Sequence, residues 1–167
     1  MFSFLKKKES DNKQENSQRT LTAFISGKVI PIEEVPDPVF AEKTLGDGAA
    51  IEPDDCVITA PCNGIITAVM SETKHAVGIR TSEGMELLIH EGLDTVAMGG
   101  DGFEVFVKEG QSVKRGDKLI AFDPQKILSR GLNTICILAV SNDKQFPDLT
   151  FETDMTAIQG ETVIARY

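Results

Sequence analysis

Two histidines, His75 and His90, are the only imidazoles in this 167-residue sequence. An imidazole can act as a nucleophile, as a hydrogen-bond donor or as a metal ligand. Residues 75–80 and 85–90 are rich in strand-forming side chains, and the segment between them, Thr81-Ser-Glu-Gly84, has the composition of a turn. The pattern predicts an antiparallel hairpin that carries both histidines.

The length of the turn decides how the two rings are related. If Ser82 and Glu83 are its two loop residues, Thr81 faces Gly84 and His75 faces His90. Directly opposed residues have Cβ atoms about 4.5 to 5.5 Å apart, whereas a loop longer or shorter by one residue would put the rings on opposite faces. We therefore predict two neighbouring imidazoles that one phosphoryl-sized group can touch together.

The surroundings predicted for this face favour nucleophilic chemistry. Val77, Ile79 and Leu88 are apolar, so they should keep an imidazole neutral near neutral pH. Thr73, two residues before His75, has a hydroxyl that can fix the tautomer of the His75 ring. Metal binding is the second interpretation, since two histidines supply only half of a tetrahedral site unless a carboxylate joins them.

The elements that must position these side chains are short. From Leu21 onward, apolar runs alternate with glycine, proline, asparagine and aspartate, which predicts an all-β, antiparallel β-sandwich or barrel with at most short helical turns. The best helical segment is 125–130, with Asp123 as N-cap and Pro124 at the first helical position. Besides the hairpin, the expected strands are 21–24, 27–31, 48–51, 55–59, 64–69, 103–106, 118–122, 135–140 and 162–165.

Composition narrows the function classes. An excess of 26 acidic over 17 basic residues gives a formal charge of −9, which argues against nucleic acid as a partner. Three cysteines without a C-x-x-C pair indicate neither a disulfide framework nor a zinc knuckle, and we expect reduced thiols in the cytoplasm. No apolar run is long enough to span a bilayer, and no signal peptide is visible.

Two regions are predicted along the chain. Residues 1–19 form a polar tail that is too poor in apolar side chains to join a core, and we expect it to be disordered. Phe2, Phe4 and Leu5 beside three lysines allow at most a peripheral contact with an anionic membrane. Residues 20–167 form the single folded domain.

Several motifs together resemble a known family. Residues 90–96 read H-x-G-x-D-T-V, and this sequence is similar to the glucose-class enzyme IIA of the bacterial phosphoenolpyruvate-dependent sugar phosphotransferase system. The other shared segments are Val35–Lys43, Gly46-Asp-Gly48, Thr73-Lys-His75, Gly102-Phe103, Glu109-Gly110 with Val113, Gly116-Asp117 and Ser141-Asn142.

The resemblance implies a phosphocarrier with a β-sandwich (barrel-sandwich hybrid) fold. His90 would accept a phosphoryl group from the histidine-containing phosphocarrier protein and pass it to a cysteine of a separate sugar-specific enzyme IIB, which acts with the membrane permease enzyme IIC. His75 would stabilise the phosphoryl group, and Thr73 would orient His75. The partner-binding residues implied in the same way are Asp37, Val39, Phe40, Asp94 and Val96.

No cofactor is implied beyond a transient phosphohistidine. In some family members the two histidines share a zinc ion with a carboxylate of a partner, so His75 and His90 are possible zinc ligands only at such an interface. A regulatory protein that acts on permeases or kinases through the same face is the alternative function. Glu91 departs from the family pattern, which usually has an apolar residue there; on a strand it would point away from His90.

Overall fold

The computed structural model describes residues 19–167, so the predicted tail lies outside the described residues except for Arg19. The fold class is confirmed: the chain is nearly all β, and every strand pair is antiparallel. Within residues 19–167, no helix is long and apolar enough to cross a membrane.

The strands are β1 (Thr20–Thr22), β2 (Gly27–Pro31), β3 (Asp47–Pro53), β4 (Val57–Thr59), β5 (Gly64–Val69), β6 (Ala76–Arg80), β7 (Glu86–Leu93), β8 (Phe103–Val105), β9 (Ser112–Val113), β10 (Lys118–Phe122), β11 (Asn133–Val140), β12 (Thr150–Phe151), β13 (Met155–Ala157) and β14 (Val163–Arg166). In the described part of the chain the α-helices are α2 (Pro38–Ala41) and α3 (Pro124–Ser129). The short 3-10 helices are η1 (Ile32–Glu34), η2 (Thr95–Met98) and η3 (Asp143–Gln145).

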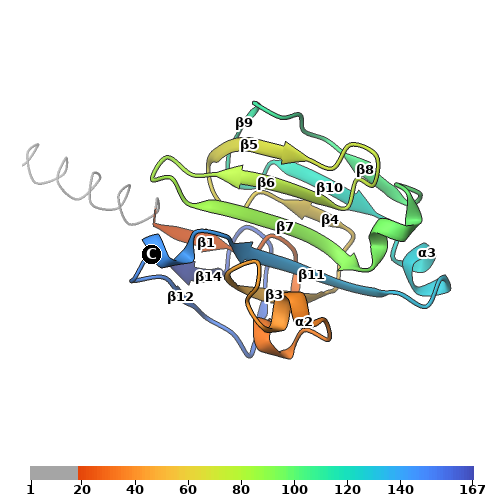
Figure 1. Ribbon diagram of the computed structural model, residues 1–167, viewed down its shortest axis with the longest axis horizontal. Coiled ribbons are helices and arrows are strands. Elements are labelled where there is room, and N and C mark those ends of the chain that lie inside the picture. The colour runs from red at the N-terminus through yellow and green to blue at the C-terminus, as the bar shows by residue number, and fades with distance from the viewer. Residues whose placement is uncertain (1–18) are drawn as a thin grey trace, which may run out of the picture.

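The strands form one large sheet and two small ones. The eight-stranded sheet has the order β13-β2-β3-β11-β7-β6-β5-β9, and the three-stranded sheets are β4-β10-β8 and β1-β14-β12. Figure 1 shows β5, β6 and β7 in front of β4, β8 and β10, with α2 on the front of the molecule and α3 at one end. The arrangement is an open sandwich, because the two outer strands of the large sheet, β13 and β9, do not pair with each other.

Apolar side chains cover both faces of the large sheet. The main core lies between the sheets and includes Ile89, Cys136 and Leu138 on one side and Leu119 and Ile120 on the other. A smaller cluster lies on the opposite face of the large sheet, beneath η1 and α2. Its members are Ile30, Ile32, Val35, Phe40, Ala50, Leu93, Ile135, Ile137 and Ala139.

The register of the β6–β7 hairpin differs from the prediction. His90 pairs with Ala76, and the predicted pairing of His75 with His90 is wrong. The turn has three loop residues, since Thr81 pairs with Met85, and Gly84 has a φ of 87°. The Thr81 hydroxyl, which accepts a hydrogen bond from the Met85 amide at 3.1 Å, stabilises this longer turn.

The change of register also changes the neighbours of His90. Val77 and Ile79, which were predicted to share its face, belong to the main core on the other face of the sheet. The residues that alternation places beside His90 are Leu88 on its own strand, Ala76 on β6 and Ile137 on β11. The face is therefore apolar as expected, but largely through different side chains.

Candidate functional site

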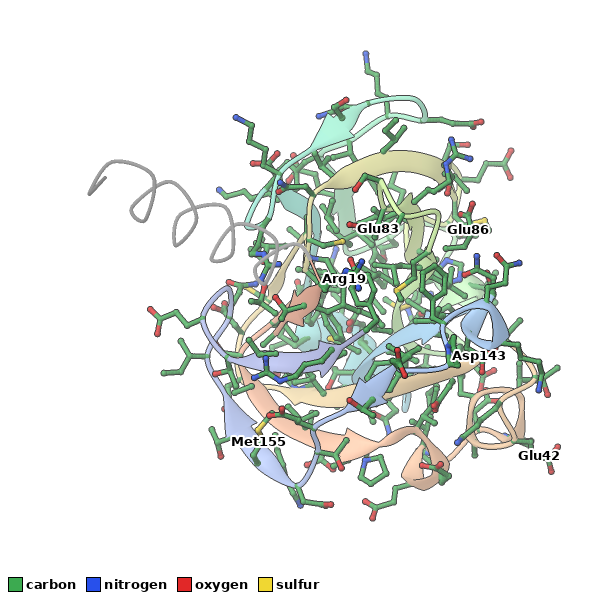
Figure 2. The ribbon with its side chains drawn as sticks, turned by 90° about the vertical axis from the view of Figure 1, so that its left-hand side faces the viewer. Arg19, Glu42, Glu83, Glu86, Asp143 and Met155 are labelled. Carbon is green, nitrogen blue, oxygen red and sulfur yellow. The ribbon has the colours of Figure 1, made fainter. Side chains whose placement is uncertain are left out.

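His90 lies near the end of β7, on the face of the large sheet opposite the main core. Its neighbours along the strand, Ile89 and Glu91, are fully buried on the other face. The His90 ring contacts the Phe40 ring in an edge-to-face arrangement, with centroids 5.0 Å apart and planes at 61°. The other end of β7, where Glu86 begins the strand and Glu83 lies in the hairpin turn, faces the viewer in Figure 2.

His75 lies beside His90 although the strand register does not pair them. The two ring centroids are 4.7 Å apart and the planes are perpendicular. Thr73 Oγ1 lies 2.8 Å from His75 Nδ1, as the sequence led us to expect. Because this hydrogen bond occupies Nδ1, Nε2 is the His75 nitrogen that remains for a bound group.

Burial makes both imidazoles neutral near pH 7. The pKa of His90 is lowered to about 4, mainly by burial and also by the neighbouring His75, while the backbone of Gly92 and the Asp37 carboxylate partly oppose the shift. Burial also lowers the pKa of His75. A neutral imidazole has a nitrogen lone pair available for attack, so both rings are in the protonation state that nucleophilic chemistry needs.

The two nitrogens of His90 differ in access. Nδ1 is buried and has no hydrogen-bond partner among the described residues, so it is closed to an incoming group. An incoming group therefore reaches Nε2. The arrangement can support attack by Nε2 of His90 with a hydrogen-bond donor, His75 Nε2, beside it.

Helix α2 supplies one wall of the site. Asp37 caps it by accepting a hydrogen bond from the Val39 amide at 2.9 Å, and Pro38 begins the helix. Phe40 is only 5% exposed and packs on His90, whereas the Val39 side chain is 45% exposed. Val39, which was predicted to bind a partner, therefore has its side chain at the surface. Phe40, which was predicted to do the same, instead packs against His90.

The segment after β7 supplies the other side. Asp94 is exposed with a φ of 58°, and it leads into η2, where Val96 is 55% exposed. The Thr95 hydroxyl donates to the Glu91 carbonyl at 2.5 Å, which ties η2 to the end of β7. Asp94 and Val96 therefore follow His90 closely along the chain, at the edge of the site.

Glu91 is the buried carboxyl that the sequence left unexplained. It points into the main core, as predicted for a strand residue next to His90, and it is completely buried. Its Oε2 lies 2.6 Å from the Cys136 thiol sulfur, and its Oε1 has no partner among the described residues. Burial raises the pKa of Glu91, so the carboxyl is held in its neutral form.

A metal ion would need ligands from outside the described part of the chain. Residues 19–167 contain no group of three or more histidine, cysteine, aspartate or glutamate side chains arranged to hold one. The neutral imidazoles of His75 and His90 suit zinc as ligands, and a carboxylate from a partner would complete the set. Zinc at a partner interface stays a prediction.

The chain is similar to known proteins in both sequence and fold. A family model described as phosphoenolpyruvate-dependent sugar phosphotransferase system, EIIA 1, matches residues 19–146. A glucose-specific EIIA component of a phosphotransferase system from Bacillus anthracis is 43% identical over 150 residues, which cover 90% of each chain.

Two further comparisons bear on domain organisation and fold. A glucose-specific EIIBCA component from Corynebacterium glutamicum is 46% identical over 129 residues, which cover 77% of this chain and 19% of the relative. The solved structure of the glucose permease IIA from Mycoplasma capricolum has a TM-score of 0.79 and 36% identity, and the match covers 87% of this chain and 93% of that one.

Proposed function

The chain belongs to the EIIA 1 family of the phosphoenolpyruvate-dependent sugar phosphotransferase system, and we propose that His90 is its phosphoryl acceptor. In this proposal the donor is the histidine-containing phosphocarrier protein, and the acceptor of the next step is a cysteine of a sugar-specific enzyme IIB. The reaction takes place in the cytoplasm. No cofactor takes part apart from the transient phosphohistidine.

The observation that carries the proposal is the pair of neutral rings, whose centroids lie 4.7 Å apart, with Nδ1 of His90 buried so that Nε2 is left for an incoming group. The Nε2 lone pair attacks the phosphorus atom of the donor phosphohistidine, the new N–P bond forms as the donor N–P bond breaks, and the donor imidazole leaves. In this proposal the Thr73 hydroxyl, 2.8 Å from His75 Nδ1, donates to that nitrogen and keeps the ring proton on Nε2, so that His75 Nε2–H can donate to a phosphoryl oxygen. Such transfers depend chiefly on positioning and charge stabilisation.

The surface around His90 suits a protein partner. Val39 and Val96 are about half exposed on the two elements that flank the site, α2 and η2. Their apolar side chains can pack against a partner and exclude water from a phosphohistidine, which hydrolyses readily. The carboxylates of Asp37 and Asp94 give the rim a negative charge that steers a basic partner.

The components that a relative combines in one polypeptide suggest the partners for transfer of the phosphoryl group from His90. The Corynebacterium glutamicum relative is named as an EIIBCA component, and the present chain matches 19% of its length. A single polypeptide that joins A, B and C components favours transfer between them. We propose that this chain serves an enzyme IIB and an enzyme IIC.

Labelled phosphoenolpyruvate tests the proposal in the presence of enzyme I and the histidine-containing phosphocarrier protein. The wild type should acquire an acid-labile label, and His90→Ala should acquire none. His75→Gln should acquire the label but pass it poorly to enzyme IIB, because the amide replaces only part of the hydrogen bonding of the imidazole. A label of normal stoichiometry on His90→Ala would contradict the assignment.

A regulatory function is a second candidate for the same face. The exposed Val39 and Val96 side chains would also suit a permease or kinase that binds the unphosphorylated protein. In that case phosphorylation of His90 should weaken binding, and zinc should strengthen it if a partner carboxylate joins His75 and His90. Binding of a candidate target that is unaffected by phosphorylation would exclude this use of the face.

A further inference from the structure

The position of His75 is not explained by the hairpin register. Ala76 pairs with His90 and shares its face, so a regular continuation of β6 would point His75 toward the opposite face. Instead the His75 and His90 rings are in perpendicular contact. Something outside the strand must turn His75 toward His90.

The backbone changes direction at Lys74, immediately before His75. Its φ is 56°, in the left-handed region that residues other than glycine adopt infrequently. The Lys74 amide donates to the Met70 carbonyl at 2.6 Å, and the Met70 amide donates to the Ala76 carbonyl at 3.1 Å, which closes the loop between β5 and β6. On the other side of His75, its carbonyl accepts from the Glu91 amide at 2.7 Å. His75 is thus held between a left-handed residue and a cross-strand hydrogen bond.

The loop is also held from outside, by Gly100. This residue follows η2 with a φ of 88°, and a Cβ atom placed there would lie 2.5 Å from the Glu72 carbonyl oxygen and 3.5 Å from Lys74 Cδ. Only glycine allows such a close approach without a shift of one of the two backbones. The segment after β7 therefore packs directly on the loop that carries Thr73, Lys74 and His75.

We propose that Lys74, through its left-handed backbone, and Gly100, through its close contact with the same loop, are positioning residues that hold the His75 ring against His90. The inference rests on the proposed function, in which His75 stabilises the phosphoryl group during its transfer to enzyme IIB. It assigns the effect of Lys74 to backbone conformation and not to the charge of its ammonium group. Displacement of His75 by about 1 Å is expected to slow donation roughly 10- to 100-fold.

Two variants and three controls separate these effects. Lys74→Val disfavours the left-handed conformation because valine is β-branched, and Gly100→Ala places a methyl group against the Glu72 carbonyl. Lys74→Gly removes the charge but keeps the backbone conformation. Gly110→Ala is matched to Gly100→Ala, since Gly110 has a φ of 86° but no atom within 4 Å of the place where a Cβ would lie. Asp154→Val introduces the same β-branched residue at a left-handed position in the turn between β12 and β13.

Two measurements are made on each purified full-length variant. Acceptance from the labelled phosphocarrier protein and donation to enzyme IIB are timed separately. The nuclear Overhauser effect between the His75 and His90 ring protons reports their contact without any reaction, and it is simple to assign because the chain has only two histidines. If wild type accepts no label, the proposed function fails, while the ring contact still tests the positioning.

Lys74→Val and Gly100→Ala should lose the ring contact and slow donation at least about tenfold, with acceptance changed much less. Lys74→Gly, Gly110→Ala and Asp154→Val should behave as wild type. The proposal is overturned if both test variants keep the ring contact and the wild-type donation rate. It is also overturned if Lys74→Gly is as slow as Lys74→Val, since the ammonium group would then be responsible. Should Lys74→Val fold poorly, Gly100→Ala decides the outcome.

Discussion

His90 and Glu91 are adjacent on β7 and lie on opposite faces of the sheet, and burial favours the neutral form of both side chains. His90 lies on the face beneath α2, where burial lowers the pKa of its imidazole and keeps the ring neutral. Glu91 lies in the main core, where burial raises the pKa of its carboxyl and also keeps it neutral. The end of β7 therefore carries two titratable side chains whose pKa shifts both favour the neutral form, which suits the proposed transfer of a phosphoryl dianion to His90.

The buried Glu91 should make the stability of the protein depend on pH. Below its ordinary pKa of 4.5 the carboxyl is protonated in both the folded and unfolded states. Above that pH the unfolded state ionises while the folded state stays protonated, so the free energy of unfolding falls by up to about 1.4 kcal/mol per pH unit until the raised folded-state pKa is reached. Glu91→Gln removes this contribution. Its stability relative to wild type should rise between pH 5 and pH 7.

Urea denaturation of both proteins across this range measures the difference. Glu91→Gln is the appropriate comparison because it keeps the size and polarity of the side chain and cannot ionise. Other carboxylates affect both proteins equally, so they cancel in the difference. Parallel stability curves for Glu91→Gln and wild type would show that Glu91 is charged in the folded protein or is not buried.

At the scale of elements, two helices begin in the same way but only one was predicted. Asp123-Pro124 led to the correct N-cap and first residue of α3. Asp37-Pro38 begins α2 with the same chemistry, but the helix ends after four residues, too few to show a helical period. Its importance comes from Phe40, whose contact with His90 joins segments far apart in the sequence.

The cap of α2 should therefore matter more for the site than that of α3. Asp37→Ala removes the acceptor for the Val39 amide and should destabilise α2 by about 0.5–2 kcal/mol, which loosens Phe40 against His90 and slows acceptance of the phosphoryl group. Asp37→Asn keeps a capping oxygen and should retain more of the activity. Thermal denaturation and the rate of labelling measure the two effects.

Asp123→Ala is the matched control. It removes the same kind of cap from α3, whose buried residue Ile127 packs into the main core and not against His90. It should lower stability to a similar extent and leave the labelling rate unchanged. Equal losses of activity in Asp37→Ala and Asp123→Ala would mean that general stability, and not the position of Phe40, limits the reaction.

For the whole molecule, local patterns predicted the class of fold but not its register. Alternating apolar residues and turn signals indicated eleven strands, the two of the hairpin included, whereas β9, β12 and β13 have only two or three residues and too little pattern to be predicted. The β6–β7 turn was predicted one residue too short, because the hydroxyl of Thr81 and the positive φ of Gly84 extend it. Neither feature can be read from composition alone.

The neighbouring residues of the site were predicted correctly, but the strand pairing that was expected to bring them together was not. Proximity of His75 to His90 and the bond from Thr73 to His75 are both present in the structure. The predicted pairing of the two histidines was wrong, and we attribute their proximity to the left-handed backbone at Lys74. The family resemblance, which the matched family model confirms, supplied the relation between distant segments that periodicity cannot give.

Localisation of the phosphoryl group in the intact protein tests the central claim most directly. The protein, labelled with nitrogen-15 in its histidine rings, is phosphorylated through phosphoenolpyruvate, enzyme I and the phosphocarrier protein, and ring spectra are recorded at alkaline pH, where phosphohistidine persists. We predict a nitrogen–phosphorus coupling at Nε2 of His90, because His90 Nδ1 is buried. We predict none on His75, because its Nδ1 is occupied by Thr73 and in our proposal its Nε2 carries the ring proton. A phosphoryl group on His75, or on Nδ1 of His90, would contradict the account.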